Sequence, residues 1–457
     1  MITNKVYYAF SFFISLVLAS VELQAQDAEE IQRMSLAECI EYAFKSNASM
    51  IDANIDTKIA EATVGEVRAA GLPQINGQIE YTNNYVIQTQ FFPATNFDPN
   101  ASDDDVVAFK FGLPHTGLAA LSLEQLVFDG TYFLGLKAAD VYTNLSKKAA
   151  EVTKAEVALN VTKSYYGVLV TKERLALLDK NIERIKQLLD ETKALYDNGF
   201  VEELDVDKLT VTHNNLVSER QRLERFSINS LNMLKFTMGM SVVEKIALSD
   251  ELVTIQMDNQ LIEEEGFDYG QRPEYAVYQV QRELDMLDEK RYRMGYYPTL
   301  SFFANYGYNG ASNTFDLYKL NGNNWNNYGG LGLSLRVPIF DGLRKKYQIQ
   351  QAQLRLQKTE FGIKQLEKTI DWERITAANT LSNSISTLKA QSENIDLAKK
   401  IASKTKIKYK EGVGSSLEVI QAETDLLDAQ NSYFSALYDA LIAKADYDKA
   451  VGKLVSE

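Results

Sequence analysis

Four short stretches of the chain alternate between apolar and polar residues, which is the pattern of a β-strand with one apolar face. The stretches are residues 74–87, 116–128, 299–309 and 328–340, and the second alternates least regularly. In the first, Ile75 and Ile79 fall on one side and Asn76 on the other. A length of about 10–13 residues suits a tilted membrane strand with an apolar outer side and a polar inner side. A soluble antiparallel sheet with one wet face has the same alternation.

Two long regions, 115–272 and 339–457, contain no proline. Both are rich in Ala, Leu, Lys, Glu and Gln, which are strong helix formers, whereas proline breaks helices. The regions predict two helix pairs, at 131–240 and at 343–452. Residues 131–196 alone would form a rod of roughly 100 Å.

Apolar residues recur along both rods at steps of three and four residues, which is typical of a coiled-coil seam rather than of a globular core. In the first rod they are Leu175, Leu178, Ile182, Ile185, Leu188, Leu189 and Leu195. In the second rod they are Leu381, Ile385, Leu388, Ile395 and Ile401. The sequence therefore predicts long antiparallel coiled-coil helices.

The two halves of the chain repeat each other at a nearly fixed offset, which indicates an internal duplication. Segments 127–130, 196–199, 204–206 and residue Gly239 match 339–342, 409–412, 417–419 and Gly452, at an offset of 212 or 213. Upstream, Pro73 matches Pro298 at an offset of 225. The predicted organisation is a first repeat at 26–240, an acidic linker at 241–270 and a second repeat at 271–457.

The chain opens with a charged residue, Lys5, and a short apolar run that ends near Ala25. Such a segment is typical of a secretory signal peptide, which we place at 1–25. An uncleaved N-terminal anchor is the alternative. No later segment approaches 18 unbroken apolar residues, so no membrane helix is expected elsewhere.

Composition excludes several classes of function. The chain has 457 residues and a formal net charge of −14, which speaks against binding nucleic acid, because phosphates require a basic face. A single cysteine, Cys39, allows neither an intrachain disulfide nor a multi-cysteine zinc site. The two histidines, His115 and His213, are isolated, so no catalytic set can be assembled around them. We expect no enzyme, no metal site and no cofactor.

The four predicted strands constrain the assembly. Lipid tolerates no open sheet edge, and the smallest membrane barrels need about eight strands. One chain therefore cannot close a barrel, whereas three chains would give a twelve-stranded barrel continued by a helical tube. The predicted fold class is mainly α, with a trimeric α-barrel of coiled-coil helices and a small transmembrane β-barrel.

At several of these positions the chain resembles the outer-membrane efflux protein family, the TolC-like channels. The resemblance lies in the segments 272–274 (Arg-Pro-Glu), 297–300 (Tyr-Pro-Thr-Leu) and 337–342 (Val-Pro-Ile-Phe-Asp-Gly), and in the paired Tyr-x-x-Gly turns at 196–199 and 409–412. It covers essentially everything from about 35 to 453. Leu343 departs from the pattern, because the family often has a second glycine there.

The resemblance implies a homotrimeric channel in the outer membrane of a Gram-negative type envelope, with a long periplasmic extension. Such a channel is a passive conduit of a tripartite efflux or type I secretion system. Its partners would be outer-membrane lipid, a periplasmic adaptor (membrane fusion) protein and an inner-membrane transporter. It needs no cofactor.

The resemblance also assigns the two turns to the periplasmic tips that meet the adaptor. The docking residues are expected to be Tyr196, Gly199, Phe200, Leu204 and Asp205 in one turn and Tyr409, Gly412, Gly414, Leu417 and Glu418 in the other. Glycine there would let another backbone approach closely. An ordinary helix–turn–helix cap without a partner is the alternative, and Ser415 with Glu418 matches a capping box.

Glu393 and Asp396 are the candidate periplasmic gate. They are three residues apart and therefore share a helix face, and family channels close near the tip with acidic rings from this region. The alternative is a solvated surface pair beside Lys399 and Lys400.

Two other classes of protein stay open at this point. A trimeric outer-membrane-anchored coiled-coil stalk or adhesin would carry its strands in one cluster at one end, whereas here strands occur in both halves. A soluble helical scaffold would use the same hairpins as ordinary sheets and would need no detergent.

Overall fold

A computed structural model describes most of the chain. The described residues are 32–102, 104–252, 267–316 and 324–454. The predicted signal peptide at 1–25 lies outside them, as do residues 253–266 of the predicted linker. The chain divides between two compact units, which are Met1–Asn54, Ala149–Tyr275 and Leu366–Glu457 in unit 1, and Ile55–Lys148 and Ala276–Gln365 in unit 2.

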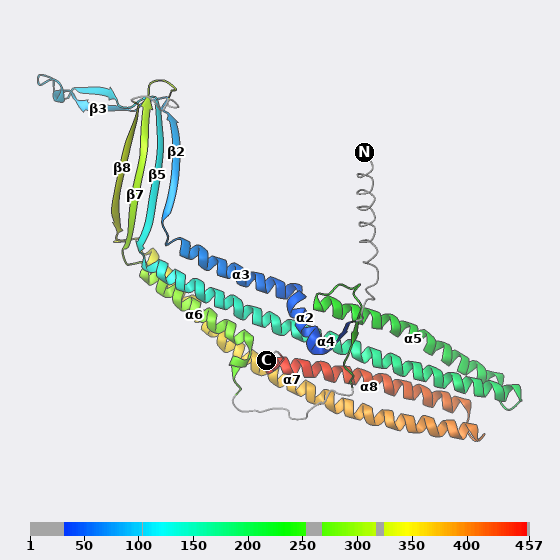
Figure 1. Cartoon of the computed structure of the whole chain (residues 1–457). Helices are drawn as coiled ribbons and strands as arrows, with labels where there is room; N and C mark the ends of the chain where they lie inside the picture. The colour runs from blue at the N-terminus through cyan, green and yellow to red at the C-terminus, as the bar shows by residue number, and fades with distance from the viewer. Residues whose placement is uncertain (1–31, 103, 253–266, 317–323, 455–457) are drawn as a thin grey trace, which may run out of the picture. The chain divides into compact units, whose positions relative to one another are not determined.

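Helices make up most of the described structure, as predicted (Figure 1). They are α2 (Leu36–Ser46), α3 (Ala48–Ala69), α4 (Gly130–Asp197), α5 (Glu203–Met238), α6 (Pro273–Met294), α7 (Arg344–Lys410) and α8 (Ser416–Ala450), with short 3-10 turns at Ala94–Asn96 and Tyr269–Gln271. With 68 residues in α4 and 67 in α7, each of these two helices is about 100 Å long. Both helices run through both units.

The predicted seam of the first helix pair is where α4 meets α5. Leu178 and Ile185 of α4 are buried against Leu216 and Leu223 of α5. In the second pair, Leu381 and Ile395 are also buried, but Ile401 is 46% exposed, so its place in the predicted seam is wrong. The side chains that meet α8 there are small alanines, Ala398 and Ala402, which let the two helices approach closely.

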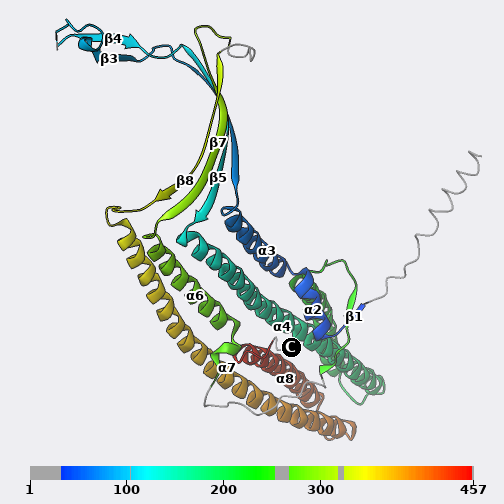
Figure 2. The same cartoon turned by 60° about the vertical axis from the view of Figure 1, so that its left-hand side comes forward.

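The described strands are β1 (Gln32–Met34), β2 (Gln74–Asn83), β3 (Thr89–Pro93), β4 (Val106–Lys110), β5 (His115–Phe128), β6 (Ile246–Leu248), β7 (Thr299–Ser312) and β8 (Trp325–Arg336). Four of them, β2, β5, β7 and β8, form one antiparallel sheet in that order (Figure 2).

The register of this sheet separates apolar from polar side chains. One row across the four strands is Ile75, Leu123, Ala304 and Leu331, and the next row is Asn76, Ser122, Asn305 and Gly330. Because neighbouring rows point to opposite faces, the alternation found in each stretch of sequence adds up to one apolar face and one polar face. The apolar face is exposed, with Ile75 at 69% and Leu331 at 76%.

Two strand ends differ from the predicted ones. β2 ends at Asn83 rather than at 87, because the amide of Asn84 turns to donate to the carbonyl of Pro114 at 2.7 Å. β8 ends at Arg336 rather than at 340, because Pro338 has no amide hydrogen for the ladder. At its other end β8 starts at Trp325, which pairs with Gly310 and lengthens β7 as well.

Leu343 adopts a backbone conformation that side chains disfavour. Its φ is 67°, the one positive value among the described non-glycine residues, and Gly342 beside it has φ 66°. The left-handed region costs a leucine roughly 1–2 kcal/mol. The position where the family often has a second glycine is therefore one where this chain holds a strained leucine.

Two small sheets were not predicted, because strands of three to five residues are too short to show a period. β1 pairs in parallel with β6 inside the predicted linker region, and β3 pairs with β4 in the connection between β2 and β5. A two-stranded hairpin alone is only marginally stable. Here a ring cluster of Phe92, Phe97, Phe109 and Phe111, with centroids 5.0–6.4 Å apart, adds to the stability of β3 and β4.

The main core of unit 1 joins α2, α4 and α5. Cys39, Tyr165 and Leu234 have no exposed surface there. The Tyr165 hydroxyl donates to Oδ2 of Asp250 at 2.8 Å, and this carboxylate also accepts from the amide of Leu36 at 3.0 Å. The contacts fix the start of α2 against α4, and Cys39 lies buried in this core.

Two side chains bind the carboxyl ends of the helices that return from the turns. Asn47 donates to the carbonyl of Thr237 at 2.8 Å near the end of α5, and Arg272 donates to the carbonyl of Ala450 at 3.1 Å at the end of α8. Both helices are followed by a glycine, and a Cβ on Gly239 or Gly452 would collide with backbone of the chain segment that carries the anchoring side chain. These contacts stabilise carbonyl groups that have no partner inside their own helix.

Among the described residues, no helix has both the length and the apolar character needed to pass through a membrane.

The buried Arg272 provides a test of this packing. Its side chain is 4% exposed and binds Glu274 and Glu373 besides Ala450. We expect Arg272→Met to lower the free energy of unfolding by about 3–5 kcal/mol, because it leaves these partners unpaired. Arg355→Met, which removes a half-exposed pair at 3.9 Å, is the matched control and should cost at most about 1 kcal/mol. Thermal unfolding of the purified variants measures both effects, and equal melting temperatures would contradict the assignment.

The same network predicts a pH dependence. Burial opposes ionisation of Glu274, but its hydrogen bonds from Arg272 dominate and hold its pKa below the usual 4.5. A carboxylate with a lowered pKa stabilises the fold above its unfolded pKa and loses that contribution as the pH falls through its folded pKa. The difference in melting temperature between the wild type and Arg272→Met should therefore shrink below pH 4.5.

Candidate functional site

The first predicted turn joins α4 to α5. Gly199 has φ 79°, a left-handed conformation that glycine adopts without strain. The amide of Phe200 donates to the carbonyl of Leu195 at 2.9 Å, and the amide of Gly199 donates to that of Tyr196 at 2.8 Å. This is the bonding of a Schellman cap, and it directs Phe200 away from the helix, with 77% of its surface exposed.

The second predicted turn, between α7 and α8, has the same geometry. Gly412 has φ 74°, and the amide of Val413 donates to the carbonyl of Lys408 at 3.0 Å. Gly414 packs tightly, because a Cβ there would lie 3.2 Å from the amide nitrogen of Tyr409. The Ser415 side chain accepts from the amide of Glu418 at 3.3 Å and so caps α8, which is one half of the predicted capping box.

The structure brings the two turns together at one end of unit 1 (Figure 1). The hydroxyl of Ser416 donates to Asp205, so the start of α8 is bound to the start of α5. Lys410 forms an ion pair with Glu191 at 2.9 Å. The sequence placed both turns at tips, but only the fold shows that they form one surface.

The residues predicted for docking differ in their exposure. Phe200 and Leu204 of the first turn are exposed, and so is Leu417 of the second. Tyr409 is 8% exposed and packs with Leu188, Leu209 and Val419. Its side chain therefore supports the tips from within instead of facing outwards. Asp205 is half-buried, and Tyr196 and Glu418 are exposed.

Sequence reasoning missed Val413, which is 77% exposed, as much as Phe200. The signal was available, because Val413 follows Phe200 at the same offset of 213 that relates Leu204 to Leu417. The four form two matched pairs of exposed apolar side chains, which we call the tip pairs: Phe200 with Val413, and Leu204 with Leu417. Apolar side chains this exposed favour contact with a partner.

The candidate gate residues lie higher on α7, on its surface. Glu393 is exposed, and the side chain of Asp396 is 78% exposed and lies 3.6 Å from Lys399. An exposed pair of this kind contributes little to stability. Asp396 therefore has the lysine neighbour expected if the two acidic residues are an ordinary solvated surface pair. Glu393 is exposed and can contact another molecule.

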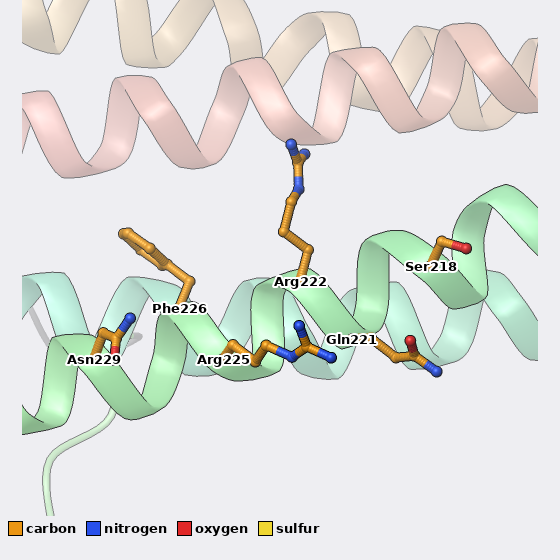
Figure 3. A pocket seen from close by; sticks show the side chains of 6 residues that line it. All are labelled: Ser218, Gln221, Arg222, Arg225, Phe226 and Asn229. Atoms are coloured by element: carbon orange, nitrogen blue, oxygen red, sulfur yellow. The ribbon is translucent and has the colours of Figure 1, made fainter.

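An open hollow of about 350 Å³ lies on α5 (Figure 3). We call it the α5 hollow; its lining residues are Ser218, Gln221, Arg222, Arg225, Phe226 and Asn229. Arg222 is paired with Glu219 on its own helix at 2.5 Å, and Phe226 is 58% exposed. Two cations beside an exposed ring suit a partner with a carboxylate and an apolar neighbour.

No group of three or more His, Cys, Asp or Glu side chains within the described ranges is arranged to hold a metal ion.

Comparisons with known proteins relate the chain to outer-membrane channels. Residues 290–453 match the family model described as Outer membrane efflux protein. Outer membrane protein TolC of Escherichia coli (strain K12) is 21% identical over 439 residues, which are 93% of this chain and 83% of TolC. Alkaline protease secretion protein AprF of Pseudomonas aeruginosa is 21% identical over 345 residues, 72% of this chain and 68% of AprF.

Among solved structures, the Campylobacter jejuni CmeC outer membrane channel superposes with a TM-score of 0.68 at 18% identity, covering 94% of this chain and 91% of CmeC. The chain thus has the fold of the TolC-like channels. The resemblance seen in the sequence is confirmed: the chain is similar to the outer-membrane efflux proteins. The predicted outer-membrane localisation agrees with these relatives.

The different exposure of the tip residues can be tested. Tyr409→Ala should destabilise unit 1 by about 3–5 kcal/mol, the usual range for removing a buried aromatic ring, whereas Phe200→Ala should change stability by less than about 0.5 kcal/mol. Hydrogen exchange of the turn amides in the purified variants distinguishes the two, with faster exchange expected only for Tyr409→Ala. Equal protection would show that Tyr409 does not hold the turns together.

Proposed function

We propose that the chain is one subunit of a homotrimeric outer-membrane channel, the passive conduit of a tripartite efflux or type I secretion system. The observation that carries this proposal is the four-stranded sheet. Its apolar face suits lipid, and its polar face suits an aqueous lumen. The relatives support both branches of the proposal, because TolC and CmeC are named as outer-membrane proteins and AprF as a secretion protein.

The open edges of the sheet support a trimer. β2 and β8 are the two edge strands of the described sheet, and lipid does not tolerate an open edge. If β2 of one copy pairs with β8 of the next, three copies close a twelve-stranded barrel. Such a contact joins two different surfaces, and three-fold rotation closes it into a ring.

The helices also have unpartnered apolar side chains on two sides. In unit 1, α5 exposes Val211 at 59%, Met233 at 56% and Phe236 at 73%. On α7, Tyr347, Leu354 and Phe361 recur at seven-residue steps in unit 2, each more than half exposed. A seven-residue step is the repeat of a coiled-coil seam, so we infer that α5 and α7 of neighbouring copies meet in a helical tube.

The helix-end anchors support internal duplication. Asn47 and Arg272 are 225 residues apart, which is the offset of Pro73 and Pro298. Their acceptors, the carbonyls of Thr237 and Ala450, are 213 residues apart, which is the offset of the two turns. Equivalent residues thus make equivalent contacts in both halves. We infer that the chain contains two copies of one unit of strands and a helix hairpin.

We propose that the tips dock a periplasmic adaptor, which links the channel to an inner-membrane transporter. The exposed tip pairs provide apolar contacts there, and the caps at Gly199 and Gly412 leave room, because an added Cβ at either glycine meets nothing within 4 Å. The channel itself performs no chemistry in this proposal, since energy comes from the transporter. The gate assigned to Glu393 and Asp396 stays a prediction.

The assembly predicts the behaviour of the purified protein. In detergent it should be a trimer by native mass spectrometry, with a circular dichroism spectrum dominated by helix, and it should conduct ions in planar bilayers because of its water-filled lumen. A monomer that stays soluble without detergent would contradict the proposal and favour a soluble scaffold. A trimer that never conducts would favour the stalk.

Docking at the tips predicts that bulk at a turn blocks transport. Gly199→Trp and Gly412→Trp should leave the trimer intact, because strain at one cap costs roughly 1–2 kcal/mol, but should reduce export at least roughly tenfold by obstructing the adaptor. Gly342→Trp is the matched control, since Gly342 also has a positive φ and open space around it but does not lie at a turn between long helices. Drug or peptide export in cells measures the effect at matched protein levels, and full export by both turn variants would exclude docking there.

A further inference from the structure

We propose that the α5 hollow is one half of a contact between two copies of this chain, and that Glu393 on α7 of the next copy completes it. The inference rests on the trimeric assembly proposed above. It adds a specific cation–carboxylate contact to the boundary between subunits, and it gives Glu393 a role other than lining the gate.

The α5 hollow lies on the side of α5 that faces away from α4. Leu216 and Leu223 are buried against α4, and Arg225 is nine residues beyond Leu216, which turns it to the opposite side of the helix at 100° per residue. Arg222 and Phe226 lie next to it. Figure 3 shows the Arg225 guanidinium extending along the helix toward Gln221, with Phe226 free on the other side.

Glu393 occupies the equivalent outward side of α7. Ile395 and Ala398 of α7 are buried, the latter against α8, and Glu393 lies two residues before Ile395, about 200° around the helix. Leu397, four residues after Glu393, shares its face and is 58% exposed. Across the described residues, neither Glu393 nor Arg225 has an ion pair within 4.0 Å.

Arg222 and Glu393 lie at the same height above the tips. Arg220 pairs with Asp179 of α4 at 2.7 Å, and Asn181, on the next half-turn of α4, donates to Gln430 of α8 at 2.7 Å. Gln430 is four residues after Leu426, which packs against Ala398 of α7. Because α7 and α8 are antiparallel, the residue level with Gln430 is about four before Ala398, next to Glu393.

The distance along each helix gives the same result. Arg222 is 19 residues from Glu203, where α5 begins, and Glu393 is 17 residues from Lys410, where α7 ends. At 1.5 Å per residue both lie about 25–29 Å from their turn. The exposed apolar residues agree in the same way, because Val211 is level with Ile401, nearer the tips.

A rotation about an axis along the helices changes no height. Three-fold assembly that brings α5 of one copy beside α7 of the next therefore places Arg222 and Arg225 opposite Glu393, and Phe226 close to Leu397. An arginine fork binds a carboxylate in two parallel hydrogen bonds, and the adjoining apolar contact would exclude water. Arg222 would exchange its partner on its own helix, Glu219, for one on the neighbour.

Crosslinking tests the contact in the full-length protein. The double variant Arg222→Cys/Glu393→Cys, treated with a short bismaleimide in detergent, should give covalent dimers and trimers, and neither single variant should. The native thiol does not interfere, because Cys39 has no exposed surface and burial raises its pKa to about 12. Arg222→Cys/Ser382→Cys is the control for height, since Ser382 lies eleven residues, or about 16 Å, from Glu393 along α7.

Charge reversal tests the electrostatic part. Arg222→Glu/Arg225→Glu should raise the dissociation constant of the trimer at least roughly tenfold through like-charge repulsion, and adding Glu393→Arg should restore it. Asn394→Arg, an exposed position that lies about 100° away around α7, should not. Rescue by one position and not by the other distinguishes this contact from a general effect of charge.

The outcomes separate this inference from the proposed function. If the wild type is a trimer but Arg222→Cys/Glu393→Cys does not crosslink, the contact is overturned and the channel proposal stands. The same holds if the trimer of Arg222→Glu/Arg225→Glu is as stable as that of the wild type. A wild-type monomer would overturn both. Loss of cation selectivity in Glu393→Gln, without any crosslink, would return Glu393 to the lumen and to the gate.

Discussion

The requirement that every backbone hydrogen-bonding group in lipid has a partner is the constraint on which the rest of the structure depends. In the sheet of β2, β5, β7 and β8, neighbouring strands pair their backbone groups with each other. The outer sides of the two edge strands, β2 and β8, have no partner strand in this sheet. An unpaired backbone group in hydrocarbon costs several kcal/mol, which is the reason for the proposal that this sheet pairs with neighbouring copies. The apolar and polar faces set by the register then decide which side of a closed sheet meets lipid. Everything proposed about assembly follows from those two edges.

The two longest helices, α4 and α7, each extend over about 100 Å. Because α4 and α7 each contribute residues to both units, a symmetry proposed for the strands applies to the helices as well. Interior contacts hold each copy together: leucines between α4 and α5, alanines between α7 and α8, and buried polar anchors at Thr237 and Ala450. The outward surfaces of α5 and α7 take no part in these contacts. They carry opposite charges at the same distance from the turns, Arg222 on α5 and Glu393 on α7.

The tips show how one repeated motif can serve two purposes. Both turns use a glycine cap of the same geometry, and both expose an apolar residue directly after it, Phe200 or Val413. Beneath them Tyr409 and the Ser416–Asp205 contact join the turns into one surface. The buried residues give rigidity and the exposed ones remain for a partner. A docking surface on rigid helix ends needs less ordering on binding than a loop would.

The sequence by itself determined the mainly helical fold, the four membrane-length strands, the two turns and the fixed offset between the halves, because these depend on local periodicity, on proline and on glycine. It could not determine which face of each helix would find a neighbour. Periodicity placed Ile401 in the seam, but in the structure Ile401 is exposed and alanines occupy the seam. The family resemblance of the turns made Tyr409 a docking residue, but its side chain is buried.

Spacing along the chain also could not show that Arg222 and Glu393, 171 residues apart, lie at the same distance from the turns. Only the antiparallel packing of four helices decided that, because height above the tips is a property of contacts between helices and not of any one of them.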